Sequence, residues 1–539
     1  MRPRYRQLIL IFGFVIAAIF GYWLASSAAP PRAARKELPK ISAKPKPAVI
    51  ADEAMPRFKR GERGPVFKLD EEASKAGALP GQRVLVFNDK SALEDFLKRA
   101  GDRIKMMGRL DALNALRIGF LNYDDLADLL AGDEEASFVF PVDVPTNGEG
   151  RAQAGAVEMG KGLLEWLGIN EDNSTWGTGV RIAILDTGVV ASSAFNTQIS
   201  SINLLPLPTD LSTQNGHGTA VASMISGVNS LTPGVAPGAS VLSIRIANDL
   251  GQSDSFLLAQ GIVAAVDAGV SIINISMGSA GDSLLVRNAI EYARAAGSLI
   301  IAATGNNGTD HVSYPAANSG VLGIGAVDAL GNHLDFSNTG SQVAASAPGF
   351  GINAAWLADQ AASVSGTSFS APIIAGAIAA IMTQSGVKNI TAQQAANLLF
   401  SYLNDGGEAG PDNEYGAGMP DIGRVLSRNT RGIYDAAVAS QRIVGPTPST
   451  PNGQIEVLVQ NRGTETLINT AVDVSTPSGT VTANITSLAP NAVKTIRVPI
   501  NSRNPNSLRY DSRVRLSGGV RDSKPSNDRR IAQYVPGGK

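Results

Sequence analysis

Between about residues 180 and 423, short continuous apolar runs alternate with longer segments of helical periodicity. The expected strands cover residues 180–185, 241–246, 270–275, 299–303 and 321–326, and the expected helices cover 217–227, 256–268, 284–296, 368–385 and 391–402. Apolar strands without polar alternation are buried on both faces, as in a parallel sheet with helices on each side. The pattern predicts an α/β domain over about 156–430, and open sheets of this kind bind ligands beyond the carboxyl ends of their strands.

A smaller unit precedes this domain. Residues 83–88, 104–107, 116–120 and 137–144 have strand-like patterns, and residues 91–100 and 123–130 have helical ones. The resulting β-α-β-β-α-β order predicts a small α+β domain of ferredoxin-like type over 81–145. A polar, glycine-rich stretch between residues 145 and 157 follows it, and exposed stretches of this kind are where chains are cut.

The C-terminal part of the chain has a third pattern. Short alternating segments cover residues 454–460, 467–476, 481–488, 493–500, 508–516 and 530–535. Their spacing predicts an antiparallel β-sandwich over 452–539. The stretch 445–451 contains three prolines and a glycine, and is therefore expected to be a linker between the α/β domain and the sandwich.

The first 80 residues have no pattern of a packed domain. Three arginines precede an uncharged apolar run over residues 8–24, and small residues and two prolines follow it. Residues 1–29 are therefore expected to be a cleaved signal peptide or a membrane anchor, and both outcomes stay open. Either one directs the protein to the cell envelope or the extracellular space. Residues 30–80 are rich in Pro, Lys, Arg, Ala and Glu, which predicts a disordered linker.

Composition narrows the possible functions. The formal net charge of the 539 residues is −1, which argues against a nucleic-acid-binding protein. The chain has no cysteine, so disulfides, cysteine nucleophiles and thiolate metal sites are excluded.

Three polar residues, at a helix start, in a glycine-rich loop and at a strand end, are candidates for a catalytic site. Ser368 lies at the start of the expected helix 368–385, where unpaired N–H groups favour developing negative charge. A serine hydroxyl needs a base to become a nucleophile, and without one Ser368 would only cap the helix. His217 lies in a glycine-rich loop that enters another helix, and Asp186 ends the strand 180–185. A carboxylate at the end of a buried strand is costly without a partner, and an imidazole N–H is a suitable one.

The surrounding residues resemble the signatures of the subtilisin-like (subtilase) serine peptidases. The three main motifs are Asp186-Thr187-Gly188, His217-Gly218-Thr219 and Gly366-Thr367-Ser368, in the family's order of Asp, His and Ser. Further matches are Gly234-Val235-Ala236-Pro237, Ser276-Met277-Gly278, Ala303-Thr304-Gly305-Asn306 and Tyr314-Pro315. The resemblance implies a subtilisin-like parallel sheet and a serine endopeptidase that works through an acyl-enzyme.

The resemblance also implies roles for individual residues. Ser368 is the expected nucleophile, His217 the base, and Asp186 the group that orients the imidazole. Asn306 is expected to stabilise the oxyanion together with the backbone N–H of Ser368. Its neighbour Asn307 is expected to be a loop residue, and His311 and His333 are expected to be solvated loop residues.

Substrate contacts follow from the same alignment. Two segments are expected to hold an extended peptide as neighbouring strands, namely Gly251-Gln252-Ser253 and Ser276-Met277-Gly278. Ser313 stands where many members of the family have glycine at the pocket floor, so the pocket is expected to be smaller. No cluster of acids marks a requirement for basic side chains, which predicts a modest preference for uncharged or apolar residues.

No cofactor and no metal site are expected. Several members of the family bind calcium in an insertion after the histidine helix, but the corresponding stretch 226–230 offers few ligand oxygens. A structural calcium ion stays an open question, because carbonyl ligands cannot be recognised in a sequence.

The flanking domains have two interpretations each. The position of residues 81–145 resembles that of the family's inhibitory propeptide, which makes the domain an expected partner of the catalytic domain, and the alternative is an accessory domain. The C-terminal region resembles bacterial CARDB-like adhesion modules at three short loops, Asn461-Arg462-Gly463, Leu488-Ala489-Pro490 and Asn527-Asp528. It is therefore a candidate for binding a surface or a protein, and the alternative is a stabilising appendage. Two rival functions for the whole chain are a non-catalytic surface protein and an esterase with the same triad.

Overall fold

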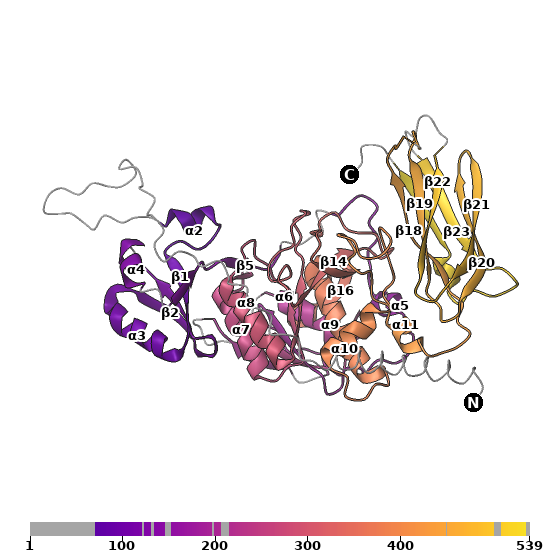
Figure 1. The fold of residues 1–539 in the computed structure, drawn as a ribbon. Helices are drawn as coiled ribbons and strands as arrows, with labels where there is room; N and C mark the ends of the chain where they lie inside the picture. The colour runs from indigo at the N-terminus through magenta and orange to yellow at the C-terminus, as the bar shows by residue number, and fades with distance from the viewer. Residues whose placement is uncertain are drawn as a thin grey trace, which may run out of the picture.

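The computed structural model describes residues 70–120, 123–130, 134–145, 152–196, 199–205, 215–448, 450–500 and 508–534. The expected signal peptide or anchor over 1–29 lies outside these residues, as do most of the expected linker 30–80 and residues 146–151 of the stretch 145–157. Figure 1 shows an α+β domain at one end, an α/β domain in the middle and a β-sandwich at the other end.

The middle domain is built on a seven-stranded sheet in the order β15-β14-β13-β12-β6-β10-β7. The strands are β6 (Arg181–Asp186), β7 (Ile199–Asn203), β10 (Ser240–Arg245), β12 (Ile272–Ile275), β13 (Leu299–Ala303), β14 (Val321–Val327) and β15 (Val343–Pro348). All neighbouring strands are parallel. The predicted parallel α/β fold is confirmed. The two edge strands β7 and β15 were not predicted from the sequence.

Two apolar cores lie on the two faces of this sheet. Successive side chains of β6 alternate between them, so Ile182 and Ile184 belong to one core and Ala183 and Leu185 to the other. The first core contains α6 (His217–Ser226) and α9 (Thr367–Gln384), with α10 (Ala392–Phe400) and α11 (Ile422–Ser427) outside them. The second contains α7 (Ser255–Asp267) and α8 (Leu284–Ala296). This packing places the starts of α6 and α9 at the carboxyl edge of the sheet.

One described helix, α9, is long and apolar enough to cross a membrane. Its most apolar window of 18 residues is 83% buried within the protein, so α9 is the central helix of the first core.

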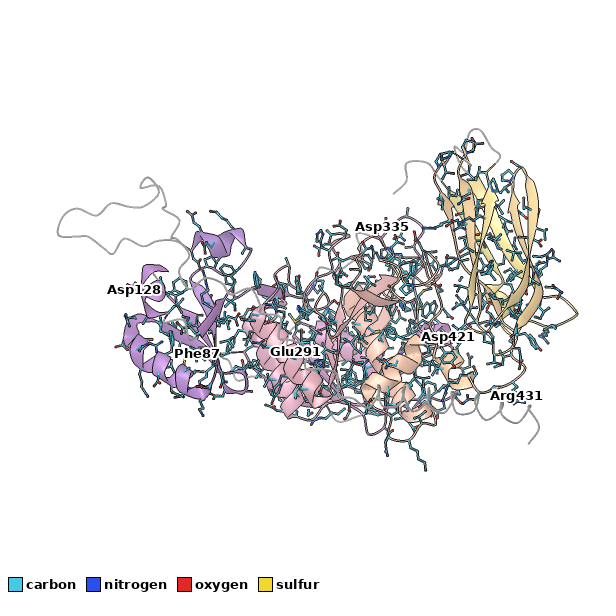
Figure 2. All side chains as sticks on the ribbon, in the orientation of Figure 1. Phe87, Asp128, Glu291, Asp335, Asp421 and Arg431 are labelled. Carbon is cyan, nitrogen blue, oxygen red and sulfur yellow. The ribbon has the colours of Figure 1, made fainter. Side chains whose placement is uncertain are left out.

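The N-terminal domain has a four-stranded antiparallel sheet in the order β2-β3-β1-β4. Its elements are β1 (Gln82–Phe87), α3 (Lys90–Ala100), β2 (Lys105–Leu110), β3 (Ala115–Gly119), α4 (Tyr123–Leu129) and β4 (Glu134–Ser137). Phe87 is one of the side chains that fill its core (Figure 2). The order of these elements agrees with the predicted β-α-β-β-α-β pattern. The predicted small α+β domain is therefore present at the N-terminal side of the α/β domain.

Two details of the N-terminal prediction were wrong. The expected linker extends to residue 80, but α2 (Glu71–Lys75) lies within it, and Asp70 forms a buried ion pair with Arg83. The expected strand 137–144 is two strands, because β4 ends at Ser137 and a separate strand β5 (Pro141–Asp143) leaves the domain.

The C-terminal domain consists of two antiparallel sheets with a common core. One contains β18 (Ala436–Val444), β19 (Gln454–Asn461) and β22 (Val493–Pro499), and the other contains β20 (Leu467–Thr476), β21 (Gly479–Leu488), β23 (Leu508–Arg515) and β24 (Arg529–Tyr534). The predicted sandwich is correct, but its expected start at residue 452 omits β18. The stretch 445–451 therefore connects two paired strands of one sheet and is not a linker between domains.

His333 is not the solvated residue that the sequence suggests. Its ring lies edge-on to Tyr415 with 6.1 Å between ring centroids, and Nε2 is enclosed without a hydrogen-bond partner among the described residues. Burial lowers the pKa of His333 to about 4. His311, in contrast, is exposed as expected.

The lowered pKa of His333 predicts a loss of stability in acid. The unfolded chain takes up a proton near pH 6.5 and the folded protein only near pH 4, so stability is complete above pH 6.5 and falls between these values. The loss reaches about 3 kcal/mol, at 1.36 kcal/mol per pKa unit. We expect the thermal midpoint of an inactive Ser368→Ala protein to fall faster from pH 7 to pH 4 than that of Ser368→Ala with His333→Phe. Parallel curves for the two proteins would contradict this account.

Candidate active site

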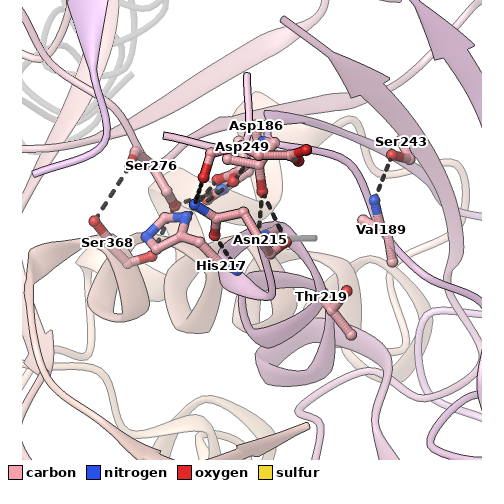
Figure 3. Close-up of polar contacts among 12 residues, drawn as sticks. Asp186, Val189, Asn215, His217, Thr219, Ser243, Asp249, Ser276 and Ser368 are labelled. Carbon is pink, nitrogen blue, oxygen red and sulfur yellow. Dashed lines mark hydrogen bonds and ion pairs between the residues drawn. The ribbon is translucent and has the colours of Figure 1, made fainter. Parts of the chain in front are cut away.

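Asp186, His217 and Ser368 meet at the carboxyl edge of the sheet, as the sequence predicts. Asp186 is the last residue of β6, His217 the first of α6, and Ser368 the second of α9. The Nδ1 atom of His217 lies 2.9 Å from Oδ1 and 3.0 Å from Oδ2 of Asp186 (Figure 3). The three residues are 8% exposed or less. An aspartate, an imidazole and a serine hydroxyl are therefore gathered in one largely water-excluded place.

Local backbone contacts fix the Asp186–His217 pair. The N–H of Thr187 donates to Asp186 Oδ1 at 2.7 Å, and the N–H of His217 donates to Asn215 Oδ1 at 2.9 Å. A Cβ atom on Gly218 would lie 2.3 Å from the carbonyl oxygen of Gly188. Only glycine at this position lets α6 start close enough to the end of β6 for the two side chains to meet.

The hydroxyl of Ser368 points to a backbone carbonyl in this structure. It donates to the carbonyl oxygen of Ser276 at 3.2 Å (Figure 3), while Nε2 of His217 is enclosed and has no hydrogen-bond partner among the described residues. Because hydrogen bonds between a nucleophile and its base often tighten only when substrate binds, this arrangement is compatible with a serine nucleophile at rest.

Asn306 follows β13 and is held beside the start of α9. Its Oδ1 accepts hydrogen bonds from the N–H of Thr367 at 2.9 Å and from the hydroxyl of Thr367 at 2.8 Å. A Cβ atom on Gly366, whose φ is 143°, would lie 2.7 Å from Nδ2 of Asn306. The amide is thus oriented with its N–H₂ group close to the backbone that carries Ser368. Asn307 has an exposed side chain, and its N–H donates to Asn338 Oδ1.

The strand β5 fills a groove that leads to these residues. It pairs antiparallel with β11 (Gln252–Asp254) on one side. On the other side, Asp143 and Gly278 exchange two backbone hydrogen bonds of 2.9 Å. The N–H of Val144 also donates to the carbonyl oxygen of Gly251 at 2.8 Å. An extended peptide segment is therefore held between the two segments that the sequence assigns to substrate binding.

Known proteins resemble the middle of this chain. The subtilase family model matches residues 177–418. The thermostable alkaline protease of Halalkalibacterium halodurans is 34% identical over 255 residues, which cover 46% of this chain and 68% of that protein. Subtilisin DY of Bacillus licheniformis is 30% identical over 252 residues, which cover 46% of this chain and 90% of that protein. The chain belongs to the subtilase family.

One further sequence match agrees with this result. Subtilisin Savinase of Lederbergia lenta is 32% identical over 245 residues, which cover 45% of this chain and 89% of that protein. A solved structure of the protease domain of PatA is 32% identical and covers 48% of this chain and 97% of that one, with a TM-score of 0.44. As a member of the subtilase family, the protein is a serine endopeptidase that acts on peptide substrates, and the matches do not identify its N- and C-terminal regions.

The subtilase has an open cleft of about 380 Å³ next to Ser368. Ser368, His217 and Asn306 line it together with Val144 and Pro145, the last described residues before the gap at 146–151. The sequence analysis gave no role to several other lining residues, among them Asp249, Trp356, Val364 and Phe369. Phe369 adjoins Ser368 and packs on the His217 ring at 5.3 Å, but Trp356 and Val364 belong to no recognised motif.

A larger hollow of about 1180 Å³ lies along the other side of β5. Ser313 lines it, and its Cβ atom is 2.9 Å from the place of a Cβ atom on Gly278. The side chain of Ser313 therefore occupies space beside the groove, where glycine would leave it open. Met277 is fully buried in the core shared with α7 and α8, so its side chain does not reach the groove.

The stretch 226–230 of the subtilase runs from the last residue of α6 into a short hairpin. It contains β8 (Val228–Asn229), which pairs with β9 (Thr232–Pro233). Among the described residues, no group of three or more His, Cys, Asp or Glu side chains is arranged to hold a metal ion.

Proposed function

We propose that this subtilase is an exported endopeptidase made as a precursor, in which residues 81–145 form an inhibitory propeptide. The single observation that carries the proposal is the insertion of β5 between Gln252–Asp254 and Gly278, with Pro145 at the cleft of Ser368. A domain that puts its own chain into the substrate groove blocks that groove and presents the chain to the nucleophile.

The proposed reaction uses the three gathered side chains and Asn306. The Nδ1–H of His217 donates to Asp186, which leaves Nε2 as the proton acceptor. Ser368 Oγ attacks the peptide carbonyl carbon as its proton moves to Nε2. The resulting oxyanion accepts hydrogen bonds from Nδ2 of Asn306 and from the N–H of Ser368. His217 then gives the proton to the leaving amine, and water repeats these steps to release the acyl group.

Contacts away from the groove support the propeptide assignment. Arg117 of β3 donates to Asp254, the N-cap of α7, at 2.7 Å, and both side chains are nearly buried. Gly108 of β2 faces the ring of Phe256, where a Cβ atom would lie 2.5 Å from a ring carbon. Leu110 and Val139 belong to the same apolar core as α7 and α8. These contacts hold the domain firmly against the catalytic domain, which supports the interpretation as an inhibitor over that as a loose appendage.

The groove supports a preference for extended peptides with uncharged side chains. Its two walls offer backbone N–H and C=O groups, which bind any sequence in the extended form. Apolar and aromatic side chains of Trp356, Val364 and Phe369 border the cleft, and Ser313 narrows the neighbouring hollow.

The flanking regions have proposed roles as well. Residues 1–29 direct export to the cell envelope or the extracellular space, as a cleaved signal peptide or as an anchor. The C-terminal sandwich binds a surface or a protein, and a purely stabilising role is the alternative. Arg424 of the catalytic domain donates to the carbonyl oxygen of Arg462 in the sandwich at 3.1 Å, which supports a fixed position of the sandwich.

The experiment that tests the proposed chemistry compares two neighbouring asparagines on casein and on a simple ester. Asn306→Ala is expected to lower kcat by about 10²–10³-fold, because one oxyanion donor is lost. Asn307→Ala is the matched control and is expected to change kcat less than about tenfold, because its exposed side chain is not assigned to the reaction. Equal losses in both variants, or hydrolysis of the ester without any hydrolysis of casein, would contradict the proposal.

A further inference from the structure

The register of β5 decides which residue lies opposite Ser276. Asp143 and Gly278 exchange both backbone hydrogen bonds, so they form a hydrogen-bonded pair of an antiparallel ladder. In such a ladder the next hydrogen-bonded pair lies two residues further along each strand, in opposite directions. That pair is Pro145 and Ser276.

Proline cannot complete this pair. Any other residue at position 145 would donate its backbone N–H to the carbonyl oxygen of Ser276, but proline has no backbone N–H. In the structure that carbonyl oxygen accepts the hydroxyl of Ser368 instead, at 3.2 Å. The backbone ladder that holds β5 so firmly at Asp143 and Val144 therefore lacks its hydrogen bond at the residue that reaches the nucleophile.

The missing hydrogen bond matters for cleavage of the bond that follows Pro145. Pro145 lines the cleft with Ser368, His217 and Asn306, and its carbonyl is the last described one of the segment that leads from β5 to these residues. A hydrogen bond beside the scissile carbonyl positions it, and this positioning contributes to the rate only if it is kept in the transition state. In the structure, the Ser368 hydroxyl is directed to the carbonyl oxygen of Ser276, and the enclosed Nε2 of His217 has no partner among the described residues.

We propose that Pro145 slows cleavage of the peptide bond that follows it, so that the segment 141–145 binds the active site as an inhibitor more than as a substrate. This inference rests on the proposed function of residues 81–145 as a propeptide. Asp143 and Val144 contribute affinity through three backbone hydrogen bonds outside the β5–β11 ladder, and Pro145 withholds one more. The lifetime of the inhibited precursor is then set by one residue of the propeptide itself.

The test measures how fast the full-length precursor disappears. Wild type, Pro145→Ala and Pro80→Ala are made by cell-free translation and followed by intact mass. Pro145→Ala restores a backbone N–H, and its precursor is expected to be processed about tenfold faster. This ratio corresponds to an activation free energy that is lower by about 1.4 kcal/mol. The product is expected to have a new N-terminus at residue 146. Pro80→Ala makes the same chemical change at an exposed position before β1, and it is expected to process at the wild-type rate.

A second measurement avoids any effect of the substitution on folding. Two synthetic peptides, one with the sequence of residues 138–150 and one with alanine in place of the proline at position 145, are given to the processed enzyme. The alanine peptide is expected to be cut after position 145 with a kcat/KM about tenfold higher.

The outcomes separate this inference from the proposed function. If all three proteins digest casein but Pro145→Ala is processed no faster than wild type, or if the two peptides are cut equally well after position 145, the role of Pro145 is wrong and the propeptide assignment stands. If none of the three proteins is processed and none digests casein, the proposed function itself is wrong.

Discussion

Replacing Ser368 with alanine is expected to lower kcat for peptide hydrolysis by about 10⁶-fold, which is the size of the loss in subtilisin. The reason is that the oxygen atom that attacks the carbonyl carbon is removed, whereas His217 and Asp186 cannot act without it. His217→Ala is expected to cause nearly the same loss, and the double variant is expected to lose no more than either one. The measurement is single-turnover hydrolysis of a peptide substrate by purified proteins in which the stretch 146–151 is replaced with the recognition site of a site-specific protease. That protease cuts all of them alike and residues 81–145 are then removed, because the inactive variants are not expected to process themselves.

Ser370→Ala is the matched control for this prediction. Ser370 lies two residues further along α9, and its hydroxyl donates to the carbonyl oxygens of Ala347 and Pro348, both at 3.1 Å. The same atom is removed from the same helix, but its bonds are structural, so a loss of about 1 kcal/mol of stability with nearly full activity is expected. Comparable losses of activity in Ser368→Ala and Ser370→Ala would mean that helix α9, and not the hydroxyl of Ser368, had been disturbed.

Wild type is expected to purify with its N-terminus within residues 145–157, whereas Ser368→Ala is expected to remain a full precursor that still carries residues 81–145. The physical reason is that β5 already lies in the groove, so the following peptide bond reacts as a tethered substrate at high effective concentration. Processing is therefore expected to be first order and unchanged by dilution. Intact-mass measurement of both proteins at two concentrations gives the result.

Two results would contradict the maturation prediction. If wild type keeps residues 81–145 covalently and is still fully active, these residues form an accessory domain and no propeptide. If processing slows in proportion to dilution, one molecule cuts another, and the tethered geometry of β5 has no role in it.

The central strands of the sheet could be predicted because burial on both faces leaves a continuous apolar run. β12 and β13 contain no residue that is exposed, and the corresponding runs were found in the sequence. The two edge strands have no such signal. β7 is exposed or half-buried along its length, and β15 consists mostly of small residues. They form strands because a neighbouring strand offers hydrogen bonds, which depends on tertiary context.

The strand β5 shows a different limit of the sequence. Residues 137–144 look like one strand, but Pro141 cannot donate a ladder hydrogen bond, and the chain changes partners at this point. The partners of β5 are more than 100 residues away in sequence, so no local pattern indicates them.

The stretch 445–451 shows the same limit. Its composition suits a linker between domains and a connection between paired strands equally well, and only the pairing of β18 with β19 distinguishes the two.

The candidate site was predictable where motifs carry it and not elsewhere. Asp186, His217, Asn306 and Ser368 stand in short motifs with glycines that the geometry requires, as Gly218 and Gly366 illustrate. Trp356 reaches the cleft by way of the connection between β16 (Ile352–Ala355) and β17 (Ala361–Val364). No property of the residues around it in the sequence indicates that this loop folds over the site.

The most direct measurement of the central claim is the position at which phenylmethylsulfonyl fluoride attaches. This reagent transfers its sulfonyl group to a serine hydroxyl that an adjacent base activates, and fluoride leaves. Peptide mapping by mass spectrometry of the processed, inactivated wild type is expected to find one sulfonyl group per chain, on Ser368. Loss of activity with the label on another residue, or full activity after treatment with no label on Ser368, would contradict the account.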